Sequence, residues 1–167
     1  CYLSMGIKSR VVTCLPKDSL KIDNDCHVIN SVYSESLKKW LWIDPTFDAY
    51  VMNEKGELLS IEEVREYLIG DKHLILNPDA NWNNQQTQTK ENYLENYMAK
   101  NLYILQRTAS SEYNMETSSE GKTYNYIELL PLDYFNQEPQ KDEDKREESN
   151  TLWIFHKTNN PNVFWEH

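Results

Sequence analysis

Two residues of this chain have types and positions suited to joint chemistry, His27 and Asp44. The alternating segment from Cys26 to Tyr33 predicts one strand, and Trp40 to Asp44 predicts a second, which ends before Pro45 because proline has no N–H for a ladder. In an antiparallel pair the start of one strand lies beside the end of the next, so we expect His27 and Asp44 to be close. A buried carboxylate fixes the tautomer of an imidazole and stabilises its charged form, as a general base beside a nucleophile requires.

The same pair also has an interpretation without chemistry. Any hairpin can carry a histidine and an aspartate, and spacing alone favours that interpretation. The surrounding motifs favour a chemical role for the pair. Before the hairpin comes Gly6-Ile7-Lys8-Ser9-Arg10-Val11, and its second strand carries Trp40-Leu41-Trp42-Ile43-Asp44-Pro45-Thr46.

These motifs, in this order, resemble the transglutaminase-like superfamily of cysteine enzymes over residues 3–46. The resemblance implies a papain-like α+β fold, with an antiparallel sheet and flanking helices. It also implies that His27 is a catalytic general base and that Asp44 orients it. Trp40 matches the family's tryptophan four places before the aspartate, so we expect it to shield the site, with Trp42 as a second supporting residue.

The chain departs from the family in two ways. Ile29 and Ser31 stand where family members often have tryptophan and glutamate. The family's nucleophilic cysteine begins a helix of about four turns that leads into the Gly-Ile motif, whereas the five residues before Gly6 make little more than one turn. Cys1 is therefore too close to be that nucleophile. We expect the chain to begin inside the helix, with the cysteine upstream or lost.

The three cysteines of the chain offer a weaker alternative. Cys14 fits a small core residue, and Cys26 adjoins His27 but should point to the opposite face of its strand. A site in which Cys1, Cys14 or Cys26 serves His27 through an altered geometry ranks last. The odd number and the spacing of the cysteines predict no disulfide framework and no zinc site, and we expect no metal and no organic cofactor.

Size and charge limit the classes of function. The chain has 167 residues, the size of one domain, and we treat 1–56 as the motif-bearing part and 57–167 as an extension of the same domain. With 27 acidic and 17 basic side chains the net charge is −10, which disfavours nucleic acid and anionic membrane surfaces as partners. No apolar run is long enough to predict a membrane span.

The second part of the chain predicts mainly structural elements. Ser60 and Glu63 form a capping box for a helix that ends near Ile69. A second helix is expected over Thr89–Tyr103, with an aromatic and apolar stripe that indicates core. The polar segment Asn77–Gln88 is a candidate substrate loop in which Trp82 is the residue of interest, and the charged run Gln137–Asn150 predicts a surface loop.

The leading hypothesis is a cysteine enzyme that acts on amide bonds, as a peptidase, an amidase or an acyl transferase. The resemblance favours hydrolysis of a peptide or protein substrate over crosslinking, because many bacterial members of the family it resembles hydrolyse peptides. The alternative is a module that has lost the chemistry and binds a peptide or a glycan in the old cleft, which the departures at Ile29 and Ser31 favour. The sequence leaves the oligomeric state and the compartment open, although an extracytoplasmic or cell-envelope location is the working expectation.

Overall fold

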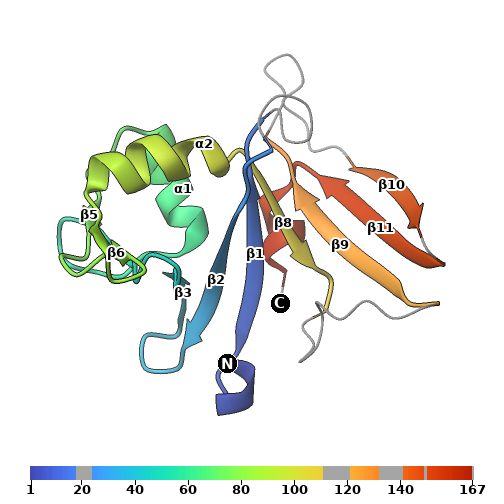
Figure 1. Ribbon diagram of the computed structural model, residues 1–167, viewed down its shortest axis with the longest axis horizontal. Coiled ribbons are helices and arrows are strands. Elements are labelled where there is room, and N and C mark those ends of the chain that lie inside the picture. The colour runs from blue at the N-terminus through green and yellow to red at the C-terminus, as the bar shows by residue number, and fades with distance from the viewer. Residues whose placement is uncertain (18–23, 111–120, 132–140, 149, 167) are drawn as a thin grey trace.

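The computed structural model describes residues 1–17, 24–110, 121–131, 141–148 and 150–166. Within these ranges the fold is mixed α+β, with one large sheet and few helices (Figure 1). The sheet has seven strands in the order β10-β11-β9-β8-β1-β2-β3. The strands are β1 (Ser9–Leu15), β2 (His27–Ser34), β3 (Lys39–Ile43), β8 (Ile104–Thr108), β9 (Thr123–Leu129), β10 (Lys141–Glu148) and β11 (Thr151–Thr158).

The sheet is mixed, and the expectation of an antiparallel sheet is correct only for part of it. β1 pairs antiparallel with both β2 and β8, and β2 pairs antiparallel with β3. The pairs β8–β9 and β10–β11 are also antiparallel. β11 instead lies parallel to β9, with Leu152 opposite Thr123. The strand order explains this, because the chain goes from β9 to the outer edge, where it forms β10, and then turns back to place β11 between β10 and β9.

The prediction of a surface loop over Gln137–Asn150 is wrong for residues 141–148, which form β10; residues 137–140 and 149 lie outside the described ranges. A charged run shows no apolar alternation, so it does not signal a strand. An edge strand needs none, because its backbone pairs on one side while charged side chains discourage further pairing on the other. The described side chains of this strand, over residues 143–148, are exposed accordingly.

The helices and the remaining short strands gather mainly at the β3 end of the sheet (Figure 1). There α1 (Ile61–Ile69), the π-helical segment η2 (Glu91–Met98) and α2 (Ala99–Asn101) accompany two small ladders, β4 (Val51–Met52) with β5 (Ile75–Leu76) and β6 (Asn81–Trp82) with β7 (Gln86–Thr87). The 3₁₀ turn η1 (Leu3–Met5) precedes β1, and α3 (Pro161–Trp165) follows β11.

Local sequence explains where the helices begin. The capping box of α1 is present: the Glu63 amide donates to Ser60 Oγ at 3.1 Å, and the Ser60 amide donates to Glu63 Oε2 at 2.7 Å.

The helix predicted over 89–103 is replaced by η2 and α2 in succession, and the Ala99 amide donates to the Leu94 carbonyl, five residues back. In such wide turns, residues four apart lie nearly above one another. Tyr93 and Tyr97 therefore share one side of η2.

One buried cluster joins the sheet to these helices. It combines Val12, Ile29 and Trp42 of the sheet with residues that follow Gly56, including Ile61, Val64, Tyr93, Leu94, Met98 and Phe164. Both parts of the chain therefore contribute to the same core. Among the described residues, no helix is both long enough and apolar enough to cross a membrane.

Candidate functional site

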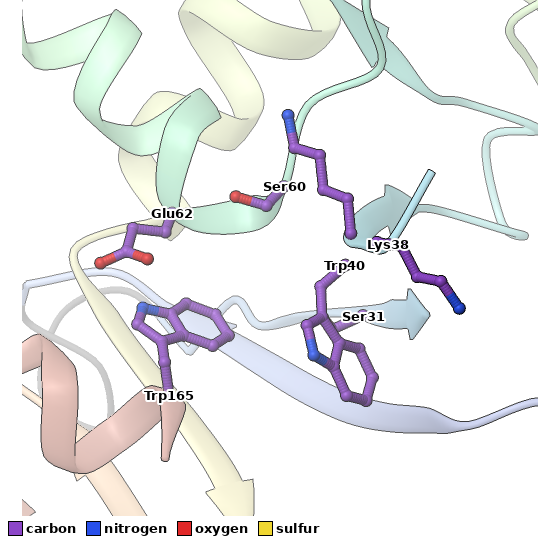
Figure 2. A pocket seen from close by; sticks show the side chains of 7 residues that line it. Ser31, Lys38, Trp40, Ser60, Glu62 and Trp165 are labelled. Atoms are coloured by element: carbon purple, nitrogen blue, oxygen red, sulfur yellow. The ribbon is translucent and has the colours of Figure 1, made fainter. Parts of the chain in front are cut away.

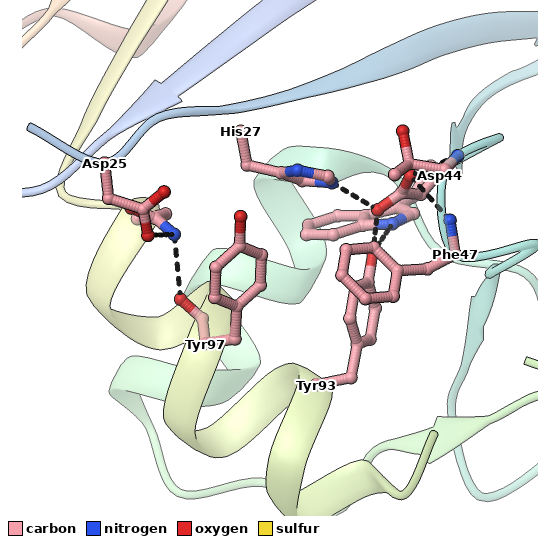
Figure 3. Close-up of polar contacts among 9 residues, drawn as sticks. Asp25, His27, Asp44, Phe47, Tyr93 and Tyr97 are labelled. Carbon is pink, nitrogen blue, oxygen red and sulfur yellow. Dashed lines mark hydrogen bonds and ion pairs between the residues drawn. The ribbon is translucent and has the colours of Figure 1, made fainter. Parts of the chain in front are cut away.

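The hairpin of β2 and β3 brings His27 and Asp44 together, as its pattern predicts. His27 is the first residue of β2, and Asp44 follows the last residue of β3 and pairs with Ala49 in a short bridge. His27 Nε2 lies 2.5 Å from Asp44 Oδ2 (Figure 3). His27 is 6% exposed and Asp44 is fully buried, so water competes little for this contact.

Asp44 is held by its own turn and by two side chains. Its Oδ1 accepts hydrogen bonds from the backbone amides of Thr46 at 2.9 Å and Phe47 at 3.3 Å. This local pattern explains why an aspartate precedes Pro45 here, because Asp side chains readily bond amides two and three residues on. Its Oδ2 accepts from His27 and, at 2.5 Å, from the Tyr93 hydroxyl. Each oxygen of this buried carboxylate therefore has two hydrogen-bond donors, as a buried polar group requires.

Tyr93 is a part of the site that sequence reasoning assigned to the core. Its hydroxyl donates to Asp44 Oδ2 and accepts a hydrogen bond from Trp42 Nε1 at 3.3 Å. Burial, followed by the charge of Asp44, raises the pKa of Tyr93 well above its usual value, so the phenol remains a donor at neutral pH. The sequence feature that could have indicated its place is the hydroxyl itself, because a tyrosine buried in an aromatic stripe needs a polar partner for that group.

The geometry selects the free nitrogen of His27. In the neutral imidazole, donation from Nε2–H to Asp44 leaves the lone pair of Nδ1 available. Among the described residues, Nδ1 has no hydrogen-bond partner. The rings of Phe47 and Tyr97 each meet the imidazole edge-on with centroids 5.3 Å away, which restricts its rotation. His27 is thus an oriented base with one open nitrogen.

The two tryptophans of β3 have different positions. Trp42 supports the pair through Tyr93 and is 1% exposed. Trp40 lies four residues before Asp44, about 13 Å along the strand, and contacts Tyr33 and the Arg10 guanidinium. It lines a separate pocket with Ser60, Glu62 and Trp165 (Figure 2). The structure therefore places Trp40 away from the His27–Asp44 pair, which it was expected to shield.

No cysteine within the described ranges is hydrogen-bonded to His27. Cys14 lies directly opposite His27 in the β1–β2 ladder, so it is on the same face of the sheet. It is fully buried, and burial raises the pKa of its thiol strongly, which keeps it protonated and unreactive. Cys1 and Cys26 are exposed. Within the same ranges, no group of three or more histidine, cysteine, aspartate or glutamate side chains could hold a metal ion.

Trp82, the residue of interest in the segment Asn77–Gln88, is 43% exposed. It belongs to the β6–β7 hairpin, which occupies much of the segment expected to be a loop. The Asn81 amide donates to the Phe47 carbonyl at 2.8 Å, so this hairpin is anchored to a residue that contacts His27. Contact between Trp82 and a substrate stays a prediction.

Comparison with known proteins identifies no relative of this chain. No protein-family model, curated protein or solved structure matches the chain. The function of the His27, Asp44 and Tyr93 group therefore has to be inferred from its geometry.

The raised pKa values of Tyr93 and Tyr97 predict that the folded protein becomes less stable at alkaline pH. Burial raises the pKa of Tyr97 to about 12, and that of Tyr93 lies well above its usual value. An unfolded tyrosine titrates near pH 10, so between about pH 10 and 12 the unfolded state releases protons that the folded state keeps, and the free energy of unfolding falls as pH rises. Urea unfolding at several pH values should show this decline, with a smaller slope in Tyr97→Phe. Identical slopes for the two proteins would contradict the assignment.

Proposed function

We propose that this protein is a cysteine enzyme of the transglutaminase-like type that acts on amide bonds, with His27 as the general base and Asp44 as its orienter. The observation that carries the proposal is the buried 2.5 Å contact between His27 Nε2 and Asp44 Oδ2, which leaves Nδ1 open. The order of elements supports a papain-like arrangement: the histidine begins β2, and the aspartate follows the neighbouring strand, β3.

The proposed reaction uses a cysteine thiol from polypeptide that precedes Cys1. Nδ1 of His27 takes the thiol proton, and the thiolate sulfur attacks the carbonyl carbon of an amide. His27 returns the proton to the departing amine as the C–N bond breaks, which leaves a thioester on the enzyme. Water then releases an acid, or a second amine takes the acyl group. Asp44 stabilises the imidazolium that exists between the two proton transfers.

Peptide or protein amides are the proposed substrates, and hydrolysis is favoured over crosslinking. We treat residues 1–167 as one domain in this proposal, because Tyr93 of the second part donates to Asp44 of the first. An excess of ten negative charges also makes nucleic acid an improbable partner.

A second candidate is a binding module without chemistry. It is favoured by the cysteines, since Cys14 is a buried, protonated thiol and Cys1 and Cys26 are exposed without a bond to His27 within the described chain. Such a module would hold a peptide or glycan beside the His27–Asp44 pair. It predicts saturable binding with no product and no covalent intermediate.

The deciding experiment begins with the intact mass of the protein from its natural source. A mass above 19.9 kDa identifies the polypeptide to assay. That protein is incubated with peptide amides, with and without hydroxylamine, and examined by mass spectrometry for cleaved product, hydroxamate and an acyl adduct on a cysteine. Product together with the adduct supports the enzyme. Saturable binding with neither product nor adduct overturns it and supports the binding module.

A further inference from the structure

Tyr97 occupies the side of His27 that the Asp44 contact leaves free. It lies four residues after Tyr93 on η2, and its ring meets His27 at 5.3 Å and 69° and Phe47 at 5.6 Å. Figure 3 shows its hydroxyl directed toward the strand of His27, on the side of the imidazole away from Asp44. A substrate that approaches His27 from the side away from Asp44 therefore comes near the Tyr97 hydroxyl.

This hydroxyl differs from that of Tyr93 in having no partner within the described ranges. The backbone carbonyl of Tyr97 accepts a bond from Asn101 Nδ2 at 3.2 Å, but the phenol oxygen makes none. The nearby carboxylate of Asp25 is already bound by Lys100 Nζ at 2.8 Å and by Asn101 Nδ2 at 3.2 Å. Tyr97 is half-buried, so its O–H is sheltered yet reachable.

The ionisation of Tyr97 suits a hydrogen-bond donor. Burial, followed by the charge of Asp25, raises its pKa to about 12. The phenol therefore keeps its proton throughout the neutral range. It can donate to a developing negative charge without transferring the proton.

We propose that Tyr97 is a further catalytic residue, whose Oη–H donates a hydrogen bond to the carbonyl oxygen of the bound amide as that oxygen becomes an oxyanion. The inference rests on the proposed function. When the C–S bond forms, the π electron pair of the carbonyl moves to oxygen, where Tyr97 stabilises it. The pair returns to re-form C=O as the C–N bond breaks, and His27 supplies the proton to nitrogen.

Tyr97→Phe tests this role in the full natural polypeptide, because phenylalanine keeps the ring against His27 and Phe47 and removes only the hydroxyl. With a peptide amide as the probe, we expect kcat to fall by about 10² to 10³, the usual loss for one oxyanion donor, with KM little changed. The rate at which iodoacetamide alkylates the catalytic thiol should not change, because the base and its orienter remain. Tyr103→Phe, at an exposed tyrosine of the same chain segment, should retain wild-type turnover.

A second measurement separates catalysis from misfolding. A peptide aldehyde adds to the thiol and places an oxyanion where the reaction forms one, so its affinity should fall in Tyr97→Phe by a factor similar to that in kcat. Wild-type kcat and aldehyde affinity in this variant, beside an inactive His27→Ala, would overturn the role of Tyr97 alone. Wild-type turnover in His27→Ala would overturn the proposed function and this inference with it.

Discussion

Replacement of His27 by alanine in the natural polypeptide is expected to lower kcat/KM for amide cleavage by about 10³-fold or more, as loss of the base does in comparable sites. The side chain provides the only open imidazole nitrogen of the buried pair, and no neighbouring described group is placed to take over the proton. The loss should appear mainly in kcat, because the proposed role of His27 is proton transfer and not substrate binding.

His156 provides a matched control for this variant. It also faces a carboxylate, with Nδ1 at 3.4 Å from Glu143 Oε2, but both side chains are exposed on the β10–β11 edge. His156→Ala should therefore keep wild-type turnover. His27→Ala also leaves Asp44 without its partner, so circular dichroism must show a folded protein at the assay temperature, and His27→Gln serves as a more conservative variant. Turnover within a few-fold of wild type in either His27 variant, by steady-state assay, would refute the assignment of the base.

Replacement of Asp44 by alanine is expected to destabilise the fold by about 3–5 kcal/mol, the range found when one member of a buried pair is removed. Four donors lose their acceptor: the amides of Thr46 and Phe47, the Tyr93 hydroxyl and His27 Nε2. Each buried group then carries its desolvation cost without compensation. The free energy of unfolding in urea measures the effect on this chain directly, without any need for turnover.

Two further variants define the origin of that loss. Asp79→Ala, at an exposed aspartate, should change stability by less than about 0.5 kcal/mol. Tyr93→Phe removes one of the four donors and leaves the carboxylate with the others, so it should cost about 1–3 kcal/mol. An Asp44→Ala protein as stable as the Asp79→Ala protein would show that the buried network does not hold the hairpin and the helical segment together.

The hairpin that carries the site could be predicted because its signals are local. Period-two alternation indicated β2 and β3, and Pro45 marked the end of the ladder. The direction of the strands then required His27 and Asp44 to approach. The capping box of α1 was visible for the same reason, since its two hydrogen bonds join residues three apart.

The other half of the site could not be predicted, because its residues come from distant segments. Tyr93 is 49 residues from Asp44, and its stripe on η2 has the same appearance as any core stripe. Trp40 shows the converse: a motif position suggested a place at the site, whereas four residues of extended strand carry it to another pocket.

The histidine–aspartate hairpin, the cap of α1 and the burial of Cys14 could be read from the chain alone, because alternation, turn residues and side-chain polarity act over a few neighbours. Long-range packing was needed to show that Tyr93 donates to the Asp44 carboxylate and accepts from Trp42, and that Tyr97 packs edge-on against His27. It was also needed to show that a charged run forms the edge strand beside a parallel pair. Those outcomes depend on which elements pack together, and the free energy that selects them arises from contacts between residues far apart in the chain.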